Sequence, residues 1–236
     1  DAPYPAEQDD HWAHLESIFD DDYLNAEARV EGDVDAAEGE EISGEYRSPY
    51  IAHAPMEPLN ATILVTDTRV DIWTGHQIQM FVEQIVAEIT GVDQDNVHLH
   101  NMFIGGSFGH RLEFDFIRQA AEIANQMRGT PVQMTYSREE DFAHDFPRHI
   151  TLGRGVAKVK DGKVNALDVQ IAGQSVMRSQ MGRMGFNLPG PDAQLHEGAW
   201  DAPNFNLPNL RVRSYRTEEL APVSSWRAVA SVSPCR

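Results

Sequence analysis

The chain has 236 residues, of which 41% are hydrophobic and 24% are charged, a composition typical of a globular protein. No run approaches the roughly 18 apolar residues of a membrane-spanning helix, the acidic start is unlike a signal peptide, and the single Cys235 forms no internal disulfide. The net charge of −18 excludes the clustered basic surface that a nucleic-acid backbone requires.

The negative charge is concentrated at the start of the chain. Residues 1–47 contain 16 acidic residues and two arginines, a net charge of −14, whereas the other 189 residues are nearly balanced. One helix is predicted from residue 11 to about residue 22 by four apolar side chains at helical spacing: Trp12, Leu15, Ile18 and Phe19. We therefore expect residues 1–41 to form a partly helical, solvated acidic leader, with an acidic docking strip as the alternative.

A domain with both helices and strands is predicted for residues 42–236. Apolar periodicity and turn residues predict these elements in chain order: a hairpin at 62–65 and 70–73, a helix at 77–90, a strand at 97–103, a helix at 113–128, a strand at 132–136, a capping box at Ser137–Glu140, a hairpin at 152–160 and 163–176, a loop at 179–190, and a strand at 209–215. This order indicates an α+β fold with a mixed sheet, two main helices and a long antiparallel hairpin.

A glycine-rich loop lies between the predicted strand at 97–103 and the helix at 113–128. Its sequence is Gly105-Gly106-Ser107-Phe108-Gly109. Glycines allow a sharp turn and close approach of a ligand, and amide groups before a helix favour an anion. The spacing matches neither the P-loop nor the dinucleotide fingerprint. An anion site is therefore one interpretation of the loop, and a structural tight turn is the other.

The histidines and nucleophiles give no catalytic site by pattern alone. His98 and His100 lie two apart on one strand face, a spacing that suits metal ligands, but no third ligand is evident. His144 and His149 flank a short segment that is typical of a hydrogen-bonded loop. No nucleophile–base pair is evident, so we assign neither a catalytic residue nor a metal ligand and disfavour a hydrolase.

Five segments in order resemble one enzyme family. They are YRSPYIAHAPMEPLNA at 46–61, IWTGHQ at 72–77, IGGSFGHR at 104–111, SREED through RH at 137–149, and PVSSWR at 222–227. Together they are similar to the molybdenum-cofactor-binding large (beta) subunit of the xanthine dehydrogenase/aldehyde oxidase family, and most similar to its isoquinoline 1-oxidoreductase branch. The resemblance extends over about residues 31–231.

The resemblance implies roles for particular residues. In the family, the glutamine matched by Gln77 hydrogen-bonds an oxo ligand of molybdenum, and the loop matched by residues 105–109 holds the cofactor. Arg227 is implied beside the cofactor, and Leu112 and Trp226 in the substrate pocket. Ser107 replaces the usual third glycine, and Leu112 stands where purine-oxidising members carry a glutamate. The implied substrate is therefore an N-heterocycle less polar than xanthine, or an aldehyde.

The family's large subunit is about three times longer than this chain, and its Gly-x-Gly-Glu segment, which supplies the catalytic base, has no match here. We therefore expect a fragment that is inactive alone and does not retain the molybdenum cofactor, a molybdopterin in its cytosine dinucleotide form. The implied partners are the rest of the large subunit and a small subunit with 2Fe–2S centres, in the cytoplasm or periplasm of a bacterium. A stand-alone binding or assembly domain is the alternative. Four apolar residues are expected in a patch exposed by the missing part: Met177, Met181, Met184 and Phe186.

Overall fold

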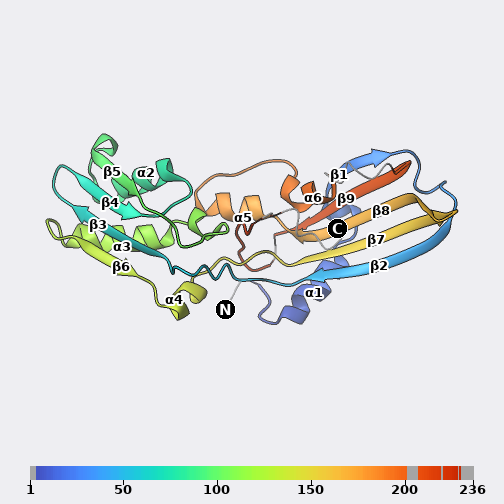
Figure 1. The fold of residues 1–236 in the computed structure, drawn as a ribbon, viewed down its shortest axis with the longest axis horizontal. Coiled ribbons are helices and arrows are strands. Elements are labelled where there is room, and N and C mark those ends of the chain that lie inside the picture. The colour runs from blue at the N-terminus through green and yellow to red at the C-terminus, as the bar shows by residue number, and fades with distance from the viewer. Residues whose placement is uncertain (1–3, 201–206, 219, 228, 230–236) are drawn as a thin grey trace. The chain divides into compact units, whose positions relative to one another are not determined.

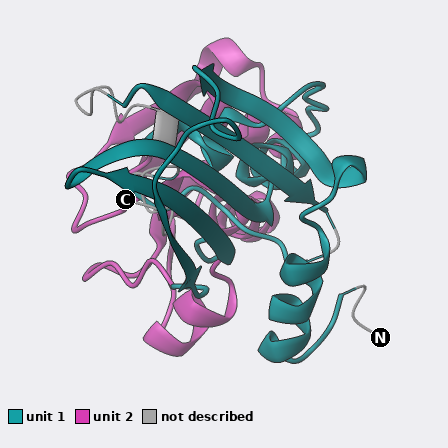
Figure 2. Cartoon of the chain, turned by 90° about the vertical axis from the view of Figure 1, so that its right-hand side faces the viewer, with its two compact units in different colours: residues 1–51, 147–236 teal, residues 52–146 magenta. Residues whose placement is uncertain are grey.

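A computed structural model describes residues 4–200, 207–218, 220–227 and 229. The chain forms two compact units (Figure 2): unit 1 comprises residues 1–51 and 147–236, and unit 2 comprises residues 52–146. The expected boundary at residue 42 lies inside unit 1. Among the described residues, no helix is long and apolar enough to cross a bilayer.

Unit 2 is a mixed sheet packed against two helices (Figure 1). Its elements are β3 (Asn60–Val65), β4 (Val70–Thr74), α2 (Gln79–Thr90), β5 (Val97–Asn101), α3 (Asp115–Gln126), β6 (Val132–Thr135) and α4 (Arg138–Ala143), with short 3-10 turns at Gln94–Asn96 and His110–Leu112. The strand order is β5-β4-β3-β6, in which β4 and β5 are parallel and the other pairs are antiparallel. The predicted α+β class and the predicted helices and strands of this unit are confirmed, with ends that shift by a few residues.

The alternation of side chains along β3 explains why this sheet binds helices on one face. Ala61, Ile63 and Val65 are buried, while the residues between them are half-buried. Helices α2 and α3 contact each other and pack against the sheet. The predicted capping box at the start of α4 is confirmed on its serine side, because the Ser137 hydroxyl accepts the N–H of Glu140.

Unit 1 is built on a second, five-stranded sheet (Figure 1). Its elements are α1 (Gln8–Ser17), β1 (Leu24–Glu31), β2 (Glu40–Ser48), β7 (Thr151–Lys160), β8 (Lys163–Gln174), α5 (Val176–Arg183), α6 (Glu197–Trp200) and β9 (Asn209–Thr217), with 3-10 turns at Asp21–Tyr23 and Ala193–Leu195. The strand order is β1-β9-β8-β7-β2, and only the β8–β9 pair is parallel. The predicted long hairpin is confirmed as β7 and β8.

The acidic start of the chain takes part in the core of unit 1. Leu15 and Ile18 are fully buried in a cluster with Leu152 and Tyr215, and β1 pairs with β9 along its length. The helix begins and ends earlier than predicted, at Gln8–Ser17. Residues 1–41, expected as a solvated leader, therefore include a helix and a strand that are packed into the sheet layer. The acidic side chains lie on the outer side of these elements, which is why composition alone pointed to a solvated segment.

The predicted loop at 179–190 is wrong in its first half, because α5 continues to Arg183. The helix begins at a cap in which the Ser175 hydroxyl accepts the N–H of Arg178 at 3.1 Å. Its eight residues include Gly182 and only three apolar side chains, so no helical period was visible in the sequence. In the sequence, the capping residue Ser175 was therefore the only local indication of where this helix starts.

Candidate functional site

The glycine-rich loop of unit 2 has the backbone shape that its composition predicted. Gly106, Phe108 and Gly109 have positive φ angles of 102°, 59° and 111°. The loop is joined to the segment before β3 in both directions: Gly105 donates its N–H to the Glu57 carboxylate at 2.6 Å, and Glu57 donates its N–H to the Gly105 carbonyl at 3.1 Å. A Cβ at position 105 would lie 2.6 Å from the Glu57 Cβ, so this close approach requires glycine.

The side chain of Arg111, which follows the loop in sequence, is fully buried and bonds to the segments beside the loop. Its guanidinium lies 3.1 Å from the Glu57 carboxylate and donates to the carbonyls of Gly75, Glu57 and Pro58 at 3.2–3.3 Å. Partial burial acts to raise the pKa of Glu57, but hydrogen bonds from Gly105 and Asn60 and the charge of Arg111 hold it below the usual value. An ionised Glu57 therefore links Gly105, at the start of the loop, to the buried Arg111 that follows the loop.

Gln77 lies beside the same loop. The Ser107 hydroxyl donates to Oε1 of Gln77 and accepts the N–H of Arg111 at 2.9 Å. The Gln77 N–H donates to the Arg111 carbonyl at 3.1 Å, so the backbones of the two segments are also joined. With Oε1 engaged by Ser107, the exposed side chain of Gln77 has its amide N–H groups left to donate elsewhere.

The neutral His76, next to Gln77, holds two backbone segments by hydrogen bonds from its ring. Its Nδ1 accepts the N–H of Ile78, and its Nε2 donates to the Glu113 carbonyl at 3.2 Å. Burial lowers the pKa of His76 to about 4, which keeps this tautomer uncharged at neutral pH. The histidine thereby ties the start of α2 to the segment that leads into α3.

The loop presents donors and an apolar rim to a ligand. Among the described residues, no protein acceptor receives the N–H groups of Gly106 and Phe108. Successive amides in a turn that includes left-handed residues can form a site that favours an anion. Four large apolar side chains near these amides are exposed: Met56, Met102, Phe103 and Phe108. These features fit a flat, phosphate-bearing cofactor, whose anionic group needs donors and whose ring system needs an apolar wall.

The structure brings together some of the predicted site residues. Gln77 and Gly105, Gly106, Ser107, Phe108 and Gly109 form one hydrogen-bonded group in unit 2. Leu112 is half-buried at the end of the 3-10 turn that follows this loop, and its N–H donates to the Gly109 carbonyl. Trp226 and Arg227 lie in unit 1, where the Arg148 guanidinium is 5.5 Å from the centre of the Trp226 ring and Arg227 is exposed.

The other histidines that the sequence singled out have protein neighbours or are buried. His100 stacks on Trp73 and lies 2.9 Å from Asp71, and His144 lies 2.8 Å from Glu140. His149 is buried, and Cys235 lies outside the described residues. In the expected exposed patch, the three methionines are half-buried and Phe186 is exposed.

Sequence reasoning missed two parts of this region. Glu57 and Arg111 were quoted within motifs but were given no role, and His53, His110 and Asp145 were not connected at all. These residues lie 35 to 92 positions apart and share no period along the chain, so only their presence in the motifs signalled them. The His53–His110–Asp145 cluster is described below.

The fold is that of an α+β domain, in which Gln77 is hydrogen-bonded beside a glycine loop whose Gly106 and Phe108 amides have no protein acceptor among the described residues. Residues 18–221 match the family described as the molybdopterin cofactor-binding domain, and the chain belongs to that family. The predicted resemblance is thereby confirmed at the level of the family.

Individual relatives agree with this assignment. The chain is 33% identical over 136 residues to isoquinoline 1-oxidoreductase subunit beta of Brevundimonas diminuta, a match covering 56% of this chain and 17% of that protein. It is 27% identical over 144 residues to the xanthine dehydrogenase molybdenum-binding subunit of Escherichia coli O157:H7, covering 60% and 19%. The aldehyde oxidoreductase of Desulfovibrio gigas has the same fold, with a TM-score of 0.62 and 20% identity over 85% of this chain and 22% of that one. The chain thus spans about a fifth of the length of these relatives.

Proposed function

We propose that this chain is part of the molybdopterin-binding subunit of a molybdenum hydroxylase that oxidises N-heterocycles or aldehydes with water as the oxygen source. The observation that carries the proposal is the group formed by Gln77 and the loop at 105–109. That group combines backbone amides that have no protein acceptor among the described residues, exposed apolar side chains, and an amide side chain whose acceptor is already engaged. The similarity to an isoquinoline 1-oxidoreductase and an aldehyde oxidoreductase supports the substrate classes.

The molybdenum cofactor, which we propose is the cytosine dinucleotide form of molybdopterin, supplies oxygen-transfer and two-electron chemistry when bound. The protein's part is binding and orientation. The amides of Gly106 and Phe108 donate to an anionic group of the cofactor, and the Nε2 of Gln77 donates to an oxo ligand. Ser107 fixes the direction of that donor, because its hydroxyl occupies the glutamine's oxygen.

The proposed pocket residues favour a weakly polar substrate. Leu112 offers an apolar side chain that cannot form the hydrogen bonds a purine needs, and Trp226 offers a flat aromatic surface. Arg227, exposed in unit 1, would contact the cofactor. These roles are consistent with a heterocycle or an aldehyde and not with xanthine.

The chain would work only together with other polypeptide. Among the described residues, no carboxylate near the loop is free to act as a base, since Glu57 is engaged by Gly105, Asn60 and Arg111. We propose that the catalytic base and further cofactor contacts come from the rest of the large subunit, and that a 2Fe–2S small subunit takes up the electrons. The chain alone would then be inactive and would not retain the cofactor.

The test compares two glycines with similar backbone strain. Gly106→Ala and Gly129→Ala both place a Cβ at a positive φ, of 102° and 83°, but only Gly106 lies in the loop. Each variant is produced in a host that makes the cofactor, with and without the polypeptide that completes the subunit, and molybdenum is measured by plasma mass spectrometry.

We expect molybdenum only in the completed subunit, near one per subunit for Gly129→Ala and at least tenfold less for Gly106→Ala (about 1.4 kcal/mol per factor of ten). Near-stoichiometric metal in the chain alone would favour the stand-alone binding domain. Equal metal in both variants would remove the loop from the site.

A further inference from the structure

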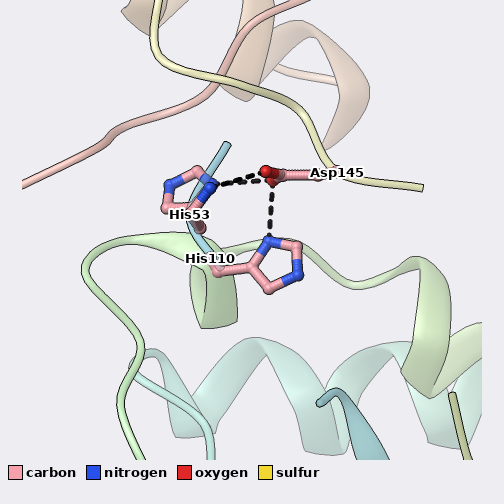
Figure 3. Close-up of side chains that lie close together, drawn as sticks. All are labelled: His53, His110 and Asp145. Atoms are coloured by element: carbon pink, nitrogen blue, oxygen red, sulfur yellow. Dashed lines mark hydrogen bonds and ion pairs between the residues drawn. The ribbon is translucent and has the colours of Figure 1, made fainter. Parts of the chain in front are cut away.

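Three buried side chains of unit 2, those of His53, His110 and Asp145, lie close together (Figure 3). Nδ1 of His53 lies 2.7 Å from Oδ1 of Asp145, and Nδ1 of His110 lies 3.0 Å from the same oxygen. One ligand atom from each residue lies within 4.8 Å of the others. The imidazoles are stacked with ring centres 5.0 Å apart, and both Nδ1 atoms lie close to the same carboxylate oxygen.

This group is nearly sealed from solvent and is held by the backbone. The side chains of His53, His110 and Asp145 are 0%, 2% and 4% exposed. They come from three distant segments: the chain before β3, the turn after the glycine loop, and the chain after α4. The other carboxylate oxygen of Asp145 accepts the N–H of His53 at 2.7 Å, which fixes the direction of its Oδ1.

The contact between His110 and Asp145 is short but is not aligned for hydrogen bonding. Although 3.0 Å separates the atoms, the buried Nδ1 of His110 has no hydrogen-bond partner among the described residues. A buried polar atom without a partner costs about 1–3 kcal/mol. A cation bound on the lone pair of this nitrogen would remove that cost, because it would contact the nitrogen and the carboxylate together.

The opposite side of His110 has the partner that metal-bound histidines usually have. Its Nε2 lies 3.3 Å from Oδ1 of Asp141, and that carboxylate is held by the N–H of Leu59 at 3.0 Å and by Arg138 at 2.9 Å. A carboxylate on the distal nitrogen fixes the tautomer and orients the ring toward a metal.

We propose that His53, His110 and Asp145 form a binding site for a divalent zinc-like ion, with Nδ1, Nδ1 and Oδ1 as ligands. Imidazole nitrogens combined with one carboxylate suit zinc and neighbouring transition metals, whereas calcium and magnesium prefer oxygen. Among the described residues, the ion pairs of Asp145 are with the two histidines alone, whereas Arg138 pairs with Asp141 and the charge of Arg111 also acts on Asp141. This ion is separate from the molybdenum cofactor and goes beyond the proposed function.

The site would adjust slightly on loading. Ligands about 2.0–2.1 Å from a tetrahedral ion lie about 3.3 Å from one another. The present separations of 2.7 and 3.0 Å therefore have to widen by roughly half an ångström. The ion would clamp the three segments to which its ligands belong, so its binding should stabilise unit 2.

The experiment uses the purified protein after treatment with a chelator. Zinc is titrated onto the folded protein, and a second sample is refolded with and without zinc because the site is buried. Bound metal is counted by plasma mass spectrometry after gel filtration, and cobalt replaces zinc to give a visible absorption spectrum. We expect one equivalent of zinc, a higher melting temperature, and the intense bands of tetrahedral cobalt.

The variants separate this site from surface histidines. His53→Gln and Asp145→Asn should lose the equivalent of metal, and Asp141→Asn should weaken binding about 10–100-fold. His144→Gln is the matched control, because His144 pairs with Glu140 at 2.8 Å but is exposed, and it should bind as the parent does. Absence of bound zinc and of cobalt bands in the parent would overturn the proposal whatever the variants do. Equal binding by parent and His53→Gln would overturn it as well.

Discussion

The Ser107 hydroxyl donates a hydrogen bond to Oε1 of Gln77, across 30 positions of sequence. Ser107 stands where the family resemblance leads one to expect glycine, and a glycine could not make this contact. The serine also accepts the N–H of Arg111, so one side chain joins the glycine loop, the turn that follows it and the segment before α2. The substitution therefore adds order to the region in which we place the cofactor.

Replacing Ser107 with alanine should release Gln77. We expect Ser107→Ala to lower the free energy of unfolding by about 1 kcal/mol, the typical net value of a hydrogen bond, and to broaden the range of Gln77 side-chain orientations. Denaturant unfolding and the NMR signals of the Gln77 amide measure these effects. Ser17→Ala is the control, because the exposed Ser17 hydroxyl bonds only to a carbonyl of its own helix and should change stability by less than about 0.5 kcal/mol. An unchanged Gln77 signal in Ser107→Ala would contradict the positioning role.

Neutralising Glu57 should loosen the glycine loop. Glu57→Gln keeps the size of the side chain but leaves the buried Arg111 without its adjacent carboxylate. We expect a loss of about 1–3 kcal/mol in unfolding free energy, because the buried guanidinium then keeps only its carbonyl hydrogen bonds and the charge of Asp141. The surface substitution Glu122→Gln on α3 serves for comparison in the same urea titrations. Equal stability of the two variants would show that the ion pair is not needed.

Removing an apolar side chain from the acidic start of the chain should destabilise unit 1. Leu15→Ala creates a cavity among Ile18, Leu152 and Tyr215, and we expect a loss of about 2–5 kcal/mol. Asp9→Asn, on the exposed side of the same helix, should remain within about 0.5 kcal/mol of the parent. Thermal unfolding measures both. If Leu15→Ala behaves like Asp9→Asn, residues 1–41 form a separate, solvated leader after all.

Mild acid should weaken the fold through two buried histidines. Burial lowers the pKa of both His76 and His149 to about 4, below the value of about 6.5 in an unfolded chain. The unfolded state therefore takes up protons first, so this stability is present above pH 6.5 and is lost as the pH falls toward 4. Each histidine should account for about 2 kcal/mol between pH 7 and pH 5.

Denaturant titrations at several pH values measure this dependence. His149→Leu should flatten the curve by one histidine's share, whereas the exposed pair of His144 and Glu140 can be removed by His144→Gln with little effect. A parent protein equally stable at pH 7 and pH 5 would contradict the lowered pKa of these histidines in the native state.

The regular elements of this protein could largely be predicted from local patterns. The apolar spacing of residues 81–89 predicted α2, Asp161-Gly162 predicted the hairpin of β7 and β8, and Ser137 predicted the start of α4. Each of these signals lies within a few positions of the residues it orders. The short α5 and the strand β1 were missed because a few residues rich in charge or glycine show no clear period.

The candidate site required the tertiary structure. The sequence by itself determined the glycine loop and its likeness to a cofactor-binding family, because glycine's backbone freedom and motif order are local properties. Only the fold decided that Ser107 contacts Gln77 and that Glu57 pairs with the buried Arg111. The fold also brings the side chains of His53, His110 and Asp145 close together. These contacts join segments 30 to 92 positions apart. Such pairs depend on how strands and helices pack, and no period along the chain records them.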